Sequence, residues 1–187
     1  MTPAARTGAA DSSAAGGARA RTAFVARFLA LFALLIVGGW ITDAPRRYAE
    51  ALRVAGTITS PLVNGWTLER RDASTGRQEV WFRRGNDQLR LAIGLEQMAL
   101  SLLPLLALLG ATPGLGARGF ALRAAIGVAG LFALDLLVIW LFPWLVQRGP
   151  VTDVIGTFLG LLTFVGGPVI LWFALTYRTL RHVWRLG

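Results

Sequence analysis

Two carboxylates stand inside long apolar stretches of this sequence, Glu96 in residues 91–111 and Asp135 in residues 120–145. A charge at the centre of a membrane span costs about 2.5–3.5 kcal/mol on insertion scales, and less toward the interface, so such a residue faces the protein interior or a partner. The helical rise places Glu96 about 10 Å deep in its stretch. As chemistry, the two carboxyls could handle protons or cations or receive an arginine of a partner subunit. As structure, they could snorkel to the interface or act as polar glue.

Asp135 is the deeper of the two, with apolar residues for several turns on either side. Two kinds of partner inside the chain are open to it. A hydrogen bond to Thr163 or to the backbone would suit a protonated acid, and a shared site with Glu96 would raise the pKa of one carboxyl. A contact with another subunit is the third alternative.

The sequence offers few other residues for catalysis or for binding a metal or cofactor. The chain has no cysteine and one histidine, His182 near its end, so a thiolate nucleophile, a histidine-based triad and a metal cluster are not expected. Gly114-Leu115-Gly116 is a short turn without a following strand and helix, so it predicts no nucleotide site. We therefore expect no catalytic, cofactor or metal site, although an aspartyl hydrolase using the two carboxylates stays formally open.

Composition indicates a membrane protein. Of 187 residues, 55% are hydrophobic and only 16% are charged, which is too apolar for an ordinary soluble domain. The net charge of +9 comes entirely from arginines at segment ends and in one loop. A nucleic-acid-binding domain would gather its basic residues on one face, whereas arginines that flank apolar spans orient a protein in the membrane and meet anionic lipid.

The apolar pattern predicts four transmembrane helices with two tails. The spans are residues 23–41, 91–111, 120–145 and 151–177, between a disordered tail at 1–22 and a short tail at 178–187. The first span could instead be a cleaved signal peptide, but no A-x-A site follows it, which favours an uncleaved anchor. Pro168 is expected to kink the last span, and Gly156 with Gly160 forms a face for close helix contact, including contact with a second copy.

Residues 42–90 form the one polar module. Its first part, 44–58, is amphipathic, with Tyr48, Leu52, Ala55 and Ile58 able to share one face. Such a helix lies on a membrane surface or covers a small sheet. Ser60-Pro61 and Asn64-Gly65 punctuate the chain. Residues 65–71 and 77–84 then alternate as a β-hairpin across a turn at 72–76, and a third run at 88–93 can pair with it.

The hairpin carries aromatic and arginine residues that are typical of interfaces. Neighbours in a strand face opposite ways, so each arginine doublet puts one side chain on either face. The surface is either a solvated edge with packed aromatics or a docking surface for a partner or for lipid headgroups. Its residues are Trp66, Arg70, Arg71, Trp81, Arg83 and Arg84.

Two stretches resemble a known family. Residues 54–66 (VAGTITSPLVNGW) and 101–114 (SLLPLLALLGATPG), together with the layout of anchor, outer module and three further spans, resemble the exosortase H-associated membrane proteins of bacteria. The resemblance implies an accessory role in sorting or processing exported proteins that carry a C-terminal tag. It does not imply the peptidase itself, because exosortases use Cys, Arg and His and this chain has no cysteine.

The sequence thus predicts an all-α membrane fold, four transmembrane helices with a small extracytoplasmic helix-plus-hairpin module between the first two. The arginines of the tails and of the loop after residue 111 favour cytoplasmic termini in a bacterial inner membrane. We expect a non-enzymatic accessory without cofactor that docks a membrane partner through the outer module and the Glu96/Asp135 face, and the resemblance implies an exosortase as that partner. The alternative is a small transporter or ion-coupled subunit that uses the two carboxyls as a relay.

Overall fold

A computed structural model describes residues 7–72, 78–91, 94–146 and 152–184. Within these ranges three helices are long and apolar enough to cross a membrane: Arg21–Thr42, Ala117–Val146 and Phe158–Arg181. About 20 residues of helix cross the hydrocarbon core of a bilayer, and each of these helices exceeds that length. Long apolar helices lie within a few residues of the expected first and third spans, and the three candidate spans suggest a membrane protein.

The elements follow one another without long connections. They are α1 (Thr7–Thr42), α2 (Ala44–Asn64), β1 (Thr67–Asp72), β2 (Gln78–Arg84), β3 (Asp87–Arg90), α3 (Leu95–Ala99), α4 (Leu102–Ala111), α5 (Ala117–Val146), α6 (Thr152–Leu161), a π-helical turn η1 (Leu162–Gly166) and α7 (Gly167–Trp184). The predicted returns at 73–76 and 147–150 lie outside the described residues.

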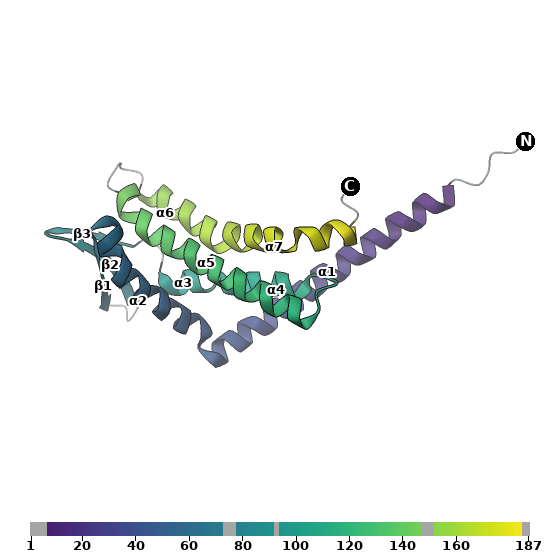
Figure 1. The fold of residues 1–187 in the computed structure, drawn as a ribbon, viewed down its shortest axis with the longest axis horizontal. Coiled ribbons are helices and arrows are strands. Elements are labelled where there is room, and N and C mark those ends of the chain that lie inside the picture. Colours follow the sequence, from purple (N-terminus) through teal and green to yellow (C-terminus); the bar gives the residue numbers. More distant parts are fainter. Residues whose placement is uncertain (1–6, 73–77, 92–93, 147–151, 185–187) are drawn as a thin grey trace, which may run out of the picture.

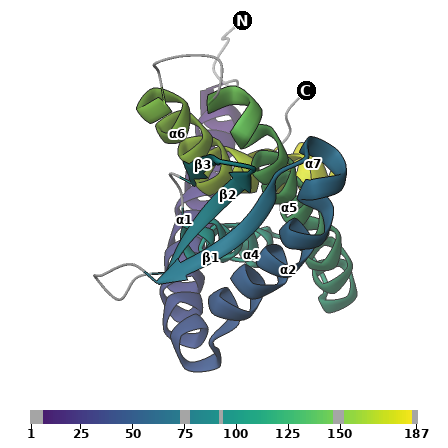
Figure 2. The ribbon, with the colours of Figure 1, turned by 90° about the vertical axis from the view of Figure 1, so that its left-hand side faces the viewer.

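The long helices form an elongated bundle with the sheet at one end. In Figure 1, α1 descends from the N-terminus to a sharp corner, from which α2 rises toward the sheet. Helices α5 and α7 run side by side between the two ends, with α4 packed against α1, α5 and α7. Helix α1 begins and helix α7 ends at the end away from the sheet. Figure 2 looks onto the sheet, which stands in front of the bundle with α2 beside it.

The predicted second span, 91–111, is wrong as a single transmembrane helix. The chain leaves β3 through Leu91, which is buried, and forms two short helices that break at Leu100 and Ser101. Pro104 explains the break, because proline lacks an N–H donor and fits the first turn of a helix better than its interior. The apolar segment Leu95–Ala111 is therefore shorter than the three candidate spans.

The last span is also shifted from its prediction. The candidate span begins at Phe158, and α7 continues as helix to Trp184, so the predicted tail from 178 is largely helical. Next to Pro168 the backbone widens into η1, where the Gly167 N–H donates to the Leu162 carbonyl. A π turn beside a proline is a common way to absorb its missing hydrogen bond.

The N-terminal segment is a further correction. Residues 1–22 were predicted to be disordered, but α1 already begins at Thr7 and runs unbroken into the span. Alanine has the highest helix propensity, and a growing helix adds a residue at little cost once the apolar span has nucleated it.

The polar module contains the predicted helix and sheet. Helix α2 does not stop at Ser60-Pro61 but ends at Gly65, whose φ of 73° is the left-handed conformation that glycine adopts readily. Strands β1, β2 and β3 form an antiparallel sheet in that order, with Leu68 opposite Phe82 and Phe82 opposite Leu89. The hairpin and the third strand are confirmed.

One predicted face of α2 is partly wrong. Tyr48 and Leu52 are buried as expected, but Ile58 is 63% exposed. Ile58 follows Tyr48 by ten residues, and each residue turns the helix by about 100°. Ile58 therefore lies roughly 80° around the helix axis from Tyr48, which turns its side chain away from the core. Gly56 and Ser60 occupy the buried side instead, and a Cβ on Gly56 would lie 3.2 Å from Leu68.

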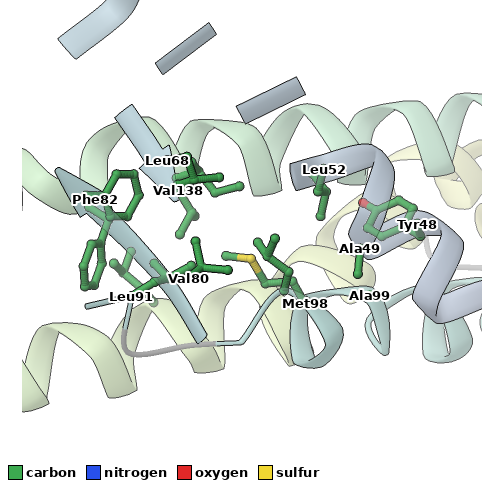
Figure 3. Packing of buried hydrophobic residues seen from close by; sticks show 14 of the residues in the cluster. Tyr48, Ala49, Leu52, Leu68, Val80, Phe82, Leu91, Met98, Ala99 and Val138 are labelled. Atoms are coloured by element: carbon green, nitrogen blue, oxygen red, sulfur yellow. The ribbon is translucent and has the colours of Figure 1, made fainter. Parts of the chain in front are cut away.

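Two clusters make the core. The larger joins the sheet to the bundle: Figure 3 shows Leu68, Val80 and Phe82 of the sheet facing Met98 of α3, Leu52 of α2 and Val138 of α5. The second cluster lies among α4, α5 and α7 and contains Leu105, Leu109, Leu131, Trp172 and Leu180.

Two glycines of α5 lie close to side chains of α7. A Cβ on Gly127 would lie 3.3 Å from Leu175, and one on Gly130 would lie 3.2 Å from Leu171. These glycines let α5 approach α7 closely. The Gly156/Gly160 face stays a prediction, because the side-chain environment of Gly156 lies outside the described part of the chain.

Phe82 offers a test of the junction between sheet and bundle. It is fully buried and stacks on Phe142 of α5 with ring centroids 5.8 Å apart. We expect Phe82→Ala to lower the free energy of unfolding in mild detergent by about 3–5 kcal/mol, because it leaves a cavity in packed surroundings. The matched variant Phe158→Ala, at a 63% exposed position, should change it little. Equal losses in the two variants would contradict this junction.

Candidate functional site

Asp135 is the most unusual polar group that the structure describes. It lies on α5 between Leu131 and Val138, within the candidate span, and its side chain is completely buried. Tyr48 of α2 reaches it from the polar module, and the Tyr48 hydroxyl donates a hydrogen bond of 2.8 Å to its Oδ2. The carboxyl is therefore held by a residue 87 positions earlier in the sequence.

A tight corner places Tyr48 there. Only Asp43 separates α1 from α2, and it has a left-handed backbone with φ of 54°, which aspartate tolerates better than most residues. Pro45 then stands in the first turn of α2, where its fixed φ suits a helix start. The Tyr48 ring meets Phe132 of α5 edge to face at 5.6 Å, which orients the hydroxyl toward Asp135.

The second oxygen of Asp135 is left open. Its Oδ1 is buried and makes no hydrogen bond with the residues that the structure describes. An ionised carboxylate in such surroundings is costly unless a cation or several donors meet it. The site can therefore hold a proton, accept one further donor, or compensate a cation.

Tyr48 remains a neutral donor in this arrangement. Burial, the neighbouring Asp135 carboxylate and their hydrogen bond all raise the pKa of the Tyr48 phenol above its usual range. Each of these causes disfavours a phenolate beside a carboxylate. The hydroxyl proton therefore stays on Tyr48 and points at Oδ2.

The two carboxyls predicted as a pair have different settings. Glu96 is exposed in the first turn of α3, so it is not a deep residue of a continuous span. An acid in the first turn of a helix is favourable because it faces unpaired N–H groups. The predicted Asp135 partner Thr163 instead donates its hydroxyl to the carbonyls of Leu159 and Gly160. The structure thus links Asp135 to Tyr48 rather than to Glu96 or Thr163.

The predicted docking residues divide between the faces of the sheet. Trp66 is buried, with the guanidinium of Arg84 5.2 Å from its ring centroid, so it does not belong to an open surface. Arg71, Trp81 and Arg83 are on the outer face, which alternates with the core face as predicted. The backbone of Arg70 lies in β1 on the core-facing register, and its side chain lies outside the described part.

The outer face is internally braced. The Arg71 guanidinium lies 5.1 Å from the Trp81 ring centroid and donates to Gln88 at 3.0 Å. The Glu69 carboxylate forms ion pairs with the guanidinium groups of Arg71 and Arg83, with N–O distances of 3.4 Å and 3.5 Å. Exposed ion pairs of this kind contribute about 0–1 kcal/mol, so they orient the side chains more than they stabilise the fold. We name Glu69, Arg71, Trp81, Arg83 and Gln88 the outer sheet face.

Sequence reasoning missed Tyr48 as the partner of Asp135. The amphipathic pattern of residues 44–58 correctly places Tyr48 on the buried face of a helix. It does not show which group accepts a hydrogen bond from the Tyr48 hydroxyl. A signal was available, because a buried tyrosine nearly always finds a hydrogen-bond partner. No group of three or more potential metal-ligating side chains occurs among the described residues.

Comparisons of the chain with protein-family models, curated protein sequences and solved structures found no match.

The contribution of the Tyr48–Asp135 bond can be measured directly. We expect Tyr48→Phe to lower the free energy of unfolding by about 0.5–2 kcal/mol, because it deprives a buried oxygen of its donor while keeping the ring. The measurement is chemical or thermal unfolding of the purified protein in mild detergent.

Tyr177→Phe is the matched control, since Tyr177 is 44% exposed on α7. A double-mutant cycle with Asp135→Leu should give a coupling energy of similar size. Additive effects of the two substitutions would contradict the bond.

Proposed function

We propose that this chain is a non-enzymatic, multi-pass accessory protein of a bacterial inner membrane, with cytoplasmic termini, that docks another membrane protein through its outer sheet face. The observation that carries the proposal is the braced set of Arg71, Trp81 and Arg83 on the outer face of the sheet, where Arg83 is exposed and the other two are partly exposed. The large core cluster holds this sheet firmly on the end of the bundle.

The chemistry of this face suits an acidic partner. Arginine and tryptophan are enriched among the residues that dominate binding energy at protein interfaces. Here Trp81 and Gln88 already restrain Arg71, so less side-chain freedom is lost on binding. A partner carboxylate can replace Glu69 as the acceptor of either arginine at small cost, because exposed pairs are weak.

The system in which the protein acts is proposed from the resemblance to exosortase-associated membrane proteins. One of the two resembling stretches runs through α2 and ends just before β1, and the other runs through α4 and its C-terminal turn. Both lie in elements that support the outer sheet face and the bundle beneath it. An exosortase-type enzyme that sorts or processes exported proteins is the partner we propose.

Affinity purification tests the docking face. We expect the double substitution Arg71→Glu/Arg83→Glu to abolish co-purification of a membrane partner from the native host, because it reverses the charge that the partner meets. The readout is quantitative mass spectrometry of proteins retained in mild detergent, with the partner identified by its sequence.

The control variant has the same change in net charge, but at a different place on the protein. Arg178→Glu/Arg181→Glu alters two exposed arginines near the end of α7 and should retain the partner. Retention by both variants, at equal protein levels, would refute docking through the sheet. Loss by both would show that net charge rather than this face is required. A partner without any sorting or peptidase relationship would refute only the exosortase assignment.

One observation favours a second candidate, an ion-coupled membrane subunit. Asp135 has a buried oxygen without a hydrogen bond among the described residues, as a proton- or cation-handling carboxyl requires. In this version Asp135 alone exchanges the proton, Tyr48 orients it as a hydrogen-bond donor, and the exposed Glu96 has no part in the site.

Flux measurements decide between the two candidates. If the chain couples to protons, Asp135→Asn should abolish proton movement into proteoliposomes, because an amide keeps the shape of the side chain and cannot exchange a proton at this site. Glu96→Gln, at an exposed position, should leave the flux unchanged. A pH-sensitive dye inside the vesicles reports the rate, and wild-type flux equal to that of empty vesicles would reject this candidate.

A further inference from the structure

Helix α2 has three sides of different chemistry. Its buried side carries Tyr48, Ala49, Leu52, Gly56 and Ser60. A polar side recurs at Arg46, Glu50, Arg53 and Thr57, and an apolar side recurs at Ala51, Val54, Ile58 and Leu62. Both series follow the three- and four-residue spacing of one helix side.

The apolar side is uncovered by the protein itself. Val54 is 43% exposed, Ile58 63% and Leu62 83%. A helix that merely covers a sheet needs one apolar side and two polar ones. Helix α2 instead has a second apolar side in addition to its buried side, together with one polar side. An exposed apolar side combined with a polar side is typical of helices that lie in a membrane interface.

The corner at Asp43 sets the depth of this helix. Since one residue separates α1 from α2, α2 begins at the bilayer level where the span of α1 ends. The last residues of that span, Trp40 and Ile41, are about 80% exposed and apolar. The apolar side of α2 therefore continues an apolar surface that already belongs to a candidate membrane helix.

Contacts with α5 place the rest of α2 at the same level. Tyr48 bonds Asp135, and the Asn64 side-chain amide donates to the Trp140 carbonyl at 2.9 Å. The Trp140 indole N–H in turn donates to Thr59 at 2.9 Å. Asp135 and Trp140 both belong to the candidate span Ala117–Val146, so both ends of α2 are tied to a helix that crosses the membrane.

We infer that α2 lies within the leaflet nearest the sheet, with Ala51, Val54, Ile58 and Leu62 against lipid acyl chains and its polar side toward the headgroups and water. Arg46 and Arg47 at its start meet the phosphates of that leaflet. The helix is thus an embedded support that joins the sheet to the bilayer, and lipid completes the surface that the protein leaves open.

Spin labels can test this inference on the whole protein, because the chain has no cysteine to interfere. Ile58→Cys and Thr57→Cys are adjacent in sequence and both exposed, so neither substitution disturbs the core. Each purified variant carries a nitroxide in vesicles of phosphatidylethanolamine and phosphatidylglycerol. Collisions with oxygen report lipid, and collisions with a water-soluble nickel complex report water.

We expect oxygen collisions to exceed nickel collisions at position 58, with the opposite order at position 57. Leu62→Cys should repeat the result of position 58, and Arg46→Cys that of position 57. High nickel access at positions 58 and 62 would overturn the inference by placing the apolar side in water. Low access to both probes there would overturn it in favour of a second copy of the chain, the only other protein in these vesicles.

Discussion

The single residue between α1 and α2 is the constraint on which the architecture depends. Because Asp43 adopts a left-handed conformation, the chain turns a sharp corner at the end of α1, and α2 then runs toward the sheet. Tyr48 is then delivered to Asp135 within one turn and a half, and the hydrogen bond between them ties the module to the bundle. This hydrogen bond also helps to position the sheet, because Leu52 and Gly56 of the same helix pack against the strands and α5.

The same arrangement separates two roles that the carboxyls were expected to share. Asp135 is enclosed with Tyr48 in the interior, whereas Glu96 is exposed in the first turn of α3. The outer sheet face stands apart from both, on the far side of a core that contains Phe82 and Trp66. A docking function and a buried polar tie can therefore be altered independently by substitution.

Features set by local pattern could be predicted from the sequence. The spans of α1 and α5 follow from the length of their apolar runs, and the sheet follows from alternation around Leu68 and Phe82. The meeting of Tyr48 with Asp135 could not be predicted, because it depends on a corner angle and on the packing of α2 against α5. The break before α4 had a signal in Pro104, whose place could equally be a kink within a span or the first turn of a new helix.

The broken segment also depends on the elements around it. At the interruption between α3 and α4, Ser101 is buried and returns its hydroxyl to the Met98 carbonyl, so the irregular backbone is satisfied within the protein. Lipid does not tolerate such backbone, which is stable at membrane depth only when protein surrounds it. Helices α3 and α4 therefore depend on the helices packed against them, which are α1, α2, α5 and α7.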